Sequence, residues 1–207
     1  MKIFSCMIIG YLIGSLNPAA LIGKIKKTDL HEHGTGNLGA TNTALVFGKL
    51  FGALVMVFDI FKGVISYVIA TLIVPGVKWV ALLCGFSAVV GHCFPFYLKF
   101  KGGKGLAAFG GVILAHAPLF FLFALITGGL IVLAVNNSTP LPYYAGVLFP
   151  IHVALNSRDL PAFIVSVAMC ALIMVMFIPN VKKALKGEDY KSREFLKTTK
   201  KSDSKEF

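Results

Sequence analysis

Residues 106–135 read LAAFGGVILAHAPLFFLFALITGGLIVLAV. As a single helix this stretch would be about 45 Å long, whereas the hydrocarbon core of a bilayer is about 30 Å thick. Pro118 interrupts the run, and a proline inside a helix breaks or kinks it. Because the stretch has almost no polar face to turn toward water, we expect two membrane-embedded helices rather than part of a soluble core.

The composition of the whole chain agrees with this interpretation. The chain has 207 residues, of which 57% are hydrophobic and 14% are charged, whereas about a quarter of a soluble domain is charged. Its mean hydropathy is +0.80. The charged residues gather in a few loops and at the C-terminal end, so the apolar residues form the long runs that a bilayer-spanning chain requires.

The excess of basic residues points to lipid rather than to nucleic acid. The net charge is +11, and a strongly basic protein first suggests a nucleic-acid partner. Here the basic residues flank apolar stretches, and positive loops that face anionic lipid heads explain the charge more simply. We therefore expect membrane lipids, and no nucleic acid, as partners.

The apolar stretches predict an all-α, polytopic integral membrane bundle. The division at Pro118 gives about seven spans, and five is the alternative if neighbouring stretches merge. The first stretch begins like a signal peptide, but it is long enough to span and has no clear cleavage site, so we expect it to be retained. The stretches lie at about 3–23, 44–74, 78–98, 106–135, 140–155 and 160–178.

Lysine placement predicts the orientation. Lysines cluster at 24–27, at 99–104 and after residue 182, and such loops usually face the cytoplasm. This puts the N-terminus outside and the C-terminus in the cytoplasm. We expect one membrane domain over residues 1–190 and a charged cytoplasmic tail over residues 191–207.

A first glycine-rich loop is a candidate anion site. Residues 34–42 read GTGNLGATN. The glycines permit unusual backbone angles that let amide N–H groups converge on an anion, and Thr and Asn side chains add donors. A helix is expected to start near Thr43, and helix N-termini favour phosphate. An ordinary turn-rich loop is the alternative.

A second basic, glycine-rich loop follows the third predicted span. Residues 91–105 read GHCFPFYLKFKGGKG, and a helix is again expected just beyond them. Lysine is a strong point-charge partner for phosphate, while a simple positive anchor would need the lysines but not the glycines. The Walker pattern is missing. His92 is interpreted either as a member of this site or as a helix-end histidine.

Other polar residues are weaker candidates. Asp59 and Lys62 lie three residues apart on one face of the second span, as a functional or a structural ion pair. Asn180 and Glu188 follow the last span, where they belong either to a surface anchor or to the same site. Scattered cysteines (Cys6, Cys84, Cys93, Cys170), without CxxC, HExxH or GxSxG motifs, predict neither a metal site nor a covalent serine mechanism.

Together these residues resemble the bacterial acyl-phosphate:glycerol-3-phosphate acyltransferase family over about residues 10–190. The similarity is carried by Gly14-Ser15, the two glycine-rich blocks, Asp59 with Lys62-Gly63, and Asn180 with Gly187-Glu188. The resemblance implies a multi-span enzyme of the bacterial cytoplasmic membrane. It would transfer an acyl group from acyl phosphate to glycerol 3-phosphate, giving lysophosphatidic acid and phosphate, without metal or cofactor. The soluble enzyme that makes acyl phosphate is an implied partner.

The resemblance also implies roles for individual residues. Those expected to act in catalysis are Thr35, Lys104, Asn180 and Glu188. Those expected to bind substrate or phosphate are Gly36, Asn37, Gly39, Asn42, His92, Lys101, Gly102 and Gly103. Lys104 would hold a phosphate, and Asn180 and Glu188 would orient the glycerol.

Several positions depart from the pattern of the family. Thr35 replaces a serine, Leu45 an arginine and Phe177 a histidine, and His31 stands where arginine is common. Each lost charged hydrogen bond is worth ~1.5–3 kcal/mol, so a weakly active or non-catalytic paralogue that binds lipid or anion is the alternative function. A transporter that uses Asp59 and Lys62 is less favoured, because the spans carry few polar residues.

Overall fold

The computed structural model describes residues 1–188, and these residues are helical apart from their connections. The predicted tail at 191–207 lies outside the described residues. The chain divides into two compact units, Met1–Pro118 and Leu119–Phe207. The helices of the first unit are α1 (Lys2–Ser15), α2 (Pro18–Ile25), α3 (Ala40–Phe47), α4 (Lys49–Ile73), α5 (Lys78–Cys93), the 3-10 helix η1 (Phe96–Leu98) and α6 (Leu106–His116). Those of the second are α7 (Pro118–Val135), α8 (Pro140–Ser157) and α9 (Leu160–Leu185).

The described helices include five segments that are long and apolar enough to cross a membrane, namely Lys2–Ile25, Lys49–Ile73, Lys78–Leu98, Pro118–Val135 and Leu160–Leu185. This number equals the alternative prediction of five spans. Seven spans would also need α6 and α8, and the 11 residues of α6 form about 16 Å of helix, half the bilayer core. The predicted division of 106–135 at Pro118 is confirmed, since α6 ends at His116 and α7 begins at Pro118.

Two of the predicted apolar stretches each contain a break in the helix. The first span is interrupted at Leu16–Asn17, because Asn17 precedes a proline and takes an extended conformation (φ −119°, ψ 100°) while its Oδ1 caps α2 by accepting from the Ala20 N–H at 2.9 Å. The second is interrupted at Gly48, whose φ of 94° only glycine adopts readily. The predicted spans at about 3–23 and 44–74 correspond to the candidate membrane segments Lys2–Ile25 and Lys49–Ile73, whereas the helix breaks at Leu16–Asn17 and at Gly48 were not predicted.

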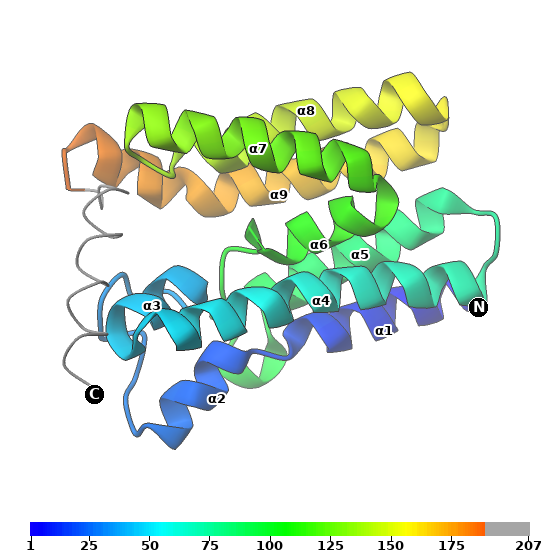
Figure 1. Cartoon of the computed structure of the whole chain (residues 1–207). Coiled ribbons are helices and arrows are strands. Elements are labelled where there is room, and N and C mark those ends of the chain that lie inside the picture. The colour runs from blue at the N-terminus through cyan, green and yellow to red at the C-terminus, as the bar shows by residue number, and fades with distance from the viewer. Residues whose placement is uncertain (189–207) are drawn as a thin grey trace. The chain divides into compact units, whose positions relative to one another are not determined.

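Close helix crossings hold the first unit together. In Figure 1, α1, α4 and α5 run beside one another, and α2 and α3 lie at the end where α4 begins. An added Cβ at Gly14 would collide with the carbonyl of Ala88, and one at Gly63 with the carbonyl of Ala108. Small residues at such crossings let helix backbones approach closely, which is how membrane helices gain packing energy.

The outer face of α4 is suited to lipid. Leu54 is 55% exposed and Phe61 is 57% exposed, and Phe58 and Ile65 are exposed on the same helix. A continuous apolar stripe of this kind would be unfavourable in water and is typical of a lipid-facing helix.

In the described part of the second unit, α7, α8 and α9 pack together. Phe120 of α7 stacks on His152 of α8, with 4.3 Å between ring centroids. The Tyr143 hydroxyl of α8 donates to the Met174 carbonyl of α9 at 3.1 Å. These contacts tie α8 to both of its neighbours.

Candidate active site

The loop over residues 34–42 is held in shape by the buried side chain of Asn42. Its Oδ1 accepts from the Thr35 N–H at 2.6 Å, and its Nδ2 donates to the Leu30 carbonyl at 2.8 Å. Asn42 is 0% exposed. Gly34 has a φ of 61°, and an added Cβ there would overlap Asn42 Oδ1. The amide of Asn42 thus fixes both sides of the loop, and a direct phosphate contact from it stays a prediction.

Helix α3 begins at the end of this loop. Its N-cap is Gly39, which supplies no side-chain cap, so the first-turn amides of α3 receive no hydrogen bond from the capping residue. The start at Ala40 lies three residues before the predicted start at Thr43. The uncapped N–H groups and the helix dipole together make this end of α3 suited to an anion.

The second loop folds back onto the end of α5. Gly102 donates its N–H to the Cys93 carbonyl, and Gly103 donates its N–H to the His92 carbonyl, both at 3.0 Å. Gly105, with a φ of 85°, then turns the chain into α6, and it also provides no side-chain cap. The predicted helix after Gly105 is confirmed, and its uncapped start is a second anion-favouring terminus.

The two glycine-rich loops meet at Gly103. An added Cβ on this residue would overlap His92 Nε2 and would lie 2.7 Å from the Leu38 carbonyl oxygen. Asn17 Nδ2 also reaches that carbonyl, at 3.4 Å. Residues far apart in sequence are therefore in direct contact, and the starts of α3 and α6 belong to one region of the first unit.

The predicted site residues differ in exposure. Lys101 is exposed, Lys104 is half-buried and His92 is 3% exposed. Half-buried members are Thr35, Gly36, Asn37 and Gly102, and buried ones are Gly39 and Gly103. A phosphate could reach the half-buried set and Lys101 directly, whereas the His92 imidazole lies beneath the surface.

Asn180 and Glu188 lie in the second unit. Asn180 is half-buried and follows Pro179 inside α9, and Glu188 is exposed beyond the end of that helix. The Glu188 N–H donates to the Lys183 carbonyl at 2.9 Å. Because these residues belong to another compact unit, a joint site with the glycine-rich loops stays a prediction.

The predicted ion pair on α4 is confirmed, and sequence reasoning missed its surroundings. Lys62 Nζ lies 2.8 Å from Asp59 Oδ1 and also donates to the Leu16 carbonyl at 3.0 Å. Tyr97, a member of the second loop to which the sequence assigned no role, donates its hydroxyl to the Ser15 carbonyl at 2.8 Å. The signal that could have indicated these contacts is the Asn-Pro pair at 17–18, which marks a helix break whose backbone groups need partners.

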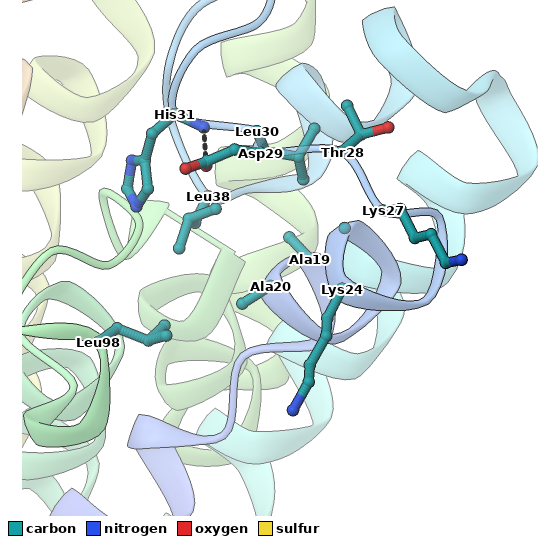
Figure 2. Close-up of a pocket in the computed structure, with 11 residues that line it drawn as sticks. Ala19, Ala20, Lys24, Lys27, Thr28, Asp29, Leu30, His31, Leu38 and Leu98 are labelled. Carbon is teal, nitrogen blue, oxygen red and sulfur yellow. Dashed lines mark hydrogen bonds between the residues drawn. The ribbon is translucent and has the colours of Figure 1, made fainter.

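A cavity of about 380 Å³ opens beside the first loop. Figure 2 shows Leu38 and Leu98 on one side of it and Lys24 and Lys27 on the other. Its wall is mainly apolar, from Ala19, Ala20, Leu30, Leu38 and Leu98, with Thr28, Asp29, His31 and the lysines as polar members. Leu38 links the cavity to the loop junction, because its carbonyl lies against Gly103.

Comparison with known proteins gives a consistent result. The family model described as Glycerol-3-phosphate acyltransferase matches residues 4–187. A glycerol-3-phosphate acyltransferase of Geobacillus kaustophilus is 38% identical over 181 residues, covering 86% of this chain and 90% of its own. One of Bacillus velezensis is 33% identical over 196 residues, covering 94% of this chain and 100% of its own.

Solved structures show the same similarity. The glycerol 3-phosphate form of an integral membrane glycerol 3-phosphate acyltransferase superposes with a TM-score of 0.86 at 30% identity, covering 92% of this chain and 96% of that chain. A lysophosphatidic acid form superposes with a TM-score of 0.85 at 29% identity, covering 95% of this chain and 99% of that chain.

Proposed function

This chain belongs to the glycerol-3-phosphate acyltransferase family and is a multi-pass integral membrane enzyme that produces lysophosphatidic acid, and from this premise we propose that its acyl donor is an acyl phosphate. Glycerol 3-phosphate is the acceptor, and the released group is inorganic phosphate. The observation that carries the proposal is the junction at Gly103, where two glycine-rich loops meet beside two uncapped helix starts. Two phosphate-bearing substrates require two anion-binding elements close together.

The reaction needs no covalent enzyme intermediate. A hydroxyl oxygen of glycerol 3-phosphate attacks the carbonyl carbon of the acyl phosphate, and an ester C–O bond forms. The bond between that carbon and the phosphate oxygen breaks, and the electron pair leaves with phosphate. The hydroxyl proton passes to the departing phosphate. The protein acts by placing the two substrates together and by stabilising the negative charge that grows on the leaving group.

Different residues bind the two substrates and stabilise the leaving group. Lys104 and the first-turn amides of α6 hold a phosphate and stabilise its charge, while Thr35, Gly36 and Asn37 shape the pocket with Gly39 and the start of α3. Lys101 attracts anionic substrates from the loop surface. Asn180 and Glu188 orient the glycerol.

The acyl chain enters the apolar cavity between α2 and η1. Leu38 belongs both to the wall of this cavity and to the loop junction, so a chain lying there would have its reactive end near Gly103. The lysines at the rim suit an amphiphile with an anionic head.

The glycine-rich loops face the cytoplasm in a bacterial cell membrane, with the N-terminus outside. This orientation follows from the lysines of the loops, and it brings the site to the side where water-soluble glycerol 3-phosphate is found. A soluble enzyme that makes acyl phosphate would deliver the donor on the same side.

The decisive experiment is an assay of phosphate release. Purified protein in lipid is given acyl phosphate and glycerol 3-phosphate, and lysophosphatidic acid is measured alongside phosphate. We expect both products in equal amounts, and a loss of about a hundredfold or more in kcat/KM for Lys104→Ala, as for other removed transition-state donors. Turnover with an acyl thioester but not with acyl phosphate would overturn the assignment of the donor.

Leu45 and Phe177 lead us to expect a lower turnover rate than an enzyme with arginine and histidine at these two positions would have. Both are half-buried, on α3 and α9 respectively, and neither can donate a hydrogen bond to an anion. The double variant Leu45→Arg with Phe177→His is expected to raise kcat/KM by about tenfold or more, because each charged hydrogen bond is worth ~1.5–3 kcal/mol. Unchanged kinetics in that variant would show that these positions do not limit the enzyme.

A further inference from the structure

Three ionisable side chains are buried together in the first unit, below the surface where substrate would bind. Asp59 and Lys62 are each 2% exposed, and His92 is 3% exposed. Ionisable groups within membrane spans are rare and usually serve a function or a partner. The reaction proposed above assigns no task to Asp59 or Lys62.

One carboxylate oxygen joins two spans. Asp59 Oδ1 lies 2.8 Å from Lys62 Nζ on the same helix and 3.4 Å from His92 Nδ1 on α5. The three-residue spacing puts Asp59 and Lys62 on one face of α4, and this face is turned toward α5. The Asp59 carboxylate therefore faces the His92 ring where α4 packs against α5.

The network continues to the break in the first span. Lys62 Nζ donates to the Leu16 carbonyl at 3.0 Å, at the point where α1 ends and the chain turns into α2. The Asn17 N–H donates to the Tyr97 hydroxyl at 3.1 Å. In a membrane, the backbone groups freed by a helix break must be satisfied internally, and Lys62 and Tyr97 do so here.

On the side away from Asp59, His92 contacts the second glycine-rich loop. Gly103 donates its N–H to the His92 carbonyl, and its Cα faces His92 Nε2 so closely that no side chain fits between them. Lys104 is the next residue along the chain. The ring is thus enclosed between Asp59 and Gly103, and its position decides where the backbone at Lys104 lies.

We propose that Asp59, Lys62 and His92 are positioning residues, which tie the Gly102–Lys104 loop to the break between α1 and α2 and so hold the phosphate pocket in its working geometry. This inference rests on the proposed function and deepens it. His92 acts through Gly103 instead of touching phosphate itself. Asn17 completes the connection, because its side-chain amide holds the Leu38 carbonyl on the opposite side of Gly103.

The test separates positioning from stability by removing both charges at once. Asp59→Asn combined with Lys62→Gln leaves no unpaired buried charge, and the amide of the glutamine keeps a donor for the Leu16 carbonyl, so the double variant is expected to fold with a Tm close to wild type. His92 nevertheless loses the charge that orients it. A small misplacement of a binding group costs up to about a hundredfold, so we expect KM to rise about tenfold or more for glycerol 3-phosphate or acyl phosphate, with a smaller change in kcat.

Tyr67→Phe is the matched control. Tyr67 is buried on the same helix and hydrogen bonds to His116 at 3.0 Å, away from both glycine-rich loops. The Tyr67→Phe variant loses this buried polar contact of α4, and we expect its KM values for both substrates to equal those of wild type. His92→Gln, which keeps a hydrogen-bonding side chain, is expected to fall between the double variant and wild type.

Amide hydrogen exchange gives a readout that does not depend on turnover. In the double variant, the Gly102 and Gly103 amides are expected to exchange faster, while the amides of α6 beyond its first turn keep their protection. If wild type shows no turnover with acyl phosphate, the proposed donor fails and the exchange result still decides the positioning role. Unchanged KM values together with unchanged exchange at Gly102 and Gly103 would overturn the proposal, and so would an equal KM increase in Tyr67→Phe.

Discussion

At Gly103 the absence of a side chain is a steric requirement. The His92 ring occupies one side of the Cα, and the Leu38 carbonyl oxygen lies 2.7 Å from the position of an added Cβ. Neither group can move aside easily, since His92 is buried and the Leu38 carbonyl accepts a hydrogen bond from Asn17 Nδ2. Any larger residue must therefore push the loop, and Lys104 with it, out of place.

Gly103→Ala is expected to raise KM for at least one phosphate-bearing substrate by about tenfold or more, in line with the cost of displacing a positioned group. Steady-state kinetics with each substrate varied in turn measure the effect. The control is Gly129→Ala on α7, where an added Cβ meets no atom within 4 Å. A Gly103→Ala enzyme with the kinetics of wild type would show that the loop tolerates displacement.

Asn42 is the second residue whose environment permits a quantitative prediction. Asn42→Leu leaves the Thr35 N–H and the Leu30 carbonyl without their partner. An unsatisfied buried group costs ~1–3 kcal/mol, so we expect a clear loss of thermal stability together with loss of activity. Thr71→Ala on α4, which removes a hydrogen bond of a half-buried threonine to the Val68 carbonyl, should change the Tm little in the same assay.

At the scale of elements, the crossing of α1 and α5 depends on close backbone approach. The Gly14 Cα lies against the Ala88 carbonyl. Gly14→Val is expected to destabilise the first unit by ~1–3 kcal/mol or more through overpacking. Unfolding in detergent, followed by circular dichroism, measures this change. Leu12→Ala on the exposed face of α1 alters volume where nothing packs tightly, and equal destabilisation by both changes would contradict the role of the crossing.

The cavity between α2 and η1 makes a prediction about chain length. Ala20 lines this cavity, so Ala20→Phe makes the cavity smaller. We therefore expect KM for long-chain acyl phosphates to rise several-fold, whereas KM for short-chain donors and for glycerol 3-phosphate stays constant. Selectivity of this size is what one filled hydrophobic subsite provides, about 1–3 kcal/mol at most. Ala53→Phe on the exposed side of α4 is the control. An equal effect on all donors would place the acyl chain elsewhere.

At the scale of the whole molecule, the orientation in the membrane can be tested with single cysteines. Lys78 and Lys101 flank the span Lys78–Leu98, and Lys27 follows the first span. We expect Lys27→Cys and Lys101→Cys to react with a membrane-impermeant maleimide only from the cytoplasmic side, and Lys78→Cys only from outside. The four native cysteines are buried, so the background reaction should be low. Labelling of Lys27→Cys and Lys101→Cys from opposite sides would contradict the predicted orientation.

Much of this protein follows from short-range information in its sequence. Hydropathy alone located the apolar segments, because the transfer of a side chain into lipid depends mainly on that side chain. Pro118 divided its run as expected, and the three-residue spacing of Asp59 and Lys62 predicted their ion pair, because helix geometry sets which residues share a face. The glycine-rich blocks indicated two loops with unusual backbone angles, such as the φ of 61° at Gly34 and of 85° at Gly105, since few residues other than glycine permit such angles.

Only the tertiary structure decided how these pieces combine. The contact between Leu38 and Gly103, the support of Gly103 by His92 and the capping of the helix break by Lys62 and Tyr97 join residues far apart in the chain. Such contacts depend on how closely α1, α4 and α5 approach one another, and this distance is set by small residues packing against backbone. The sequence by itself thus determined a membrane enzyme with two glycine-rich loops. The packing of its helices determined that the loops meet, because close approach is a property of pairs of helices and not of either one alone.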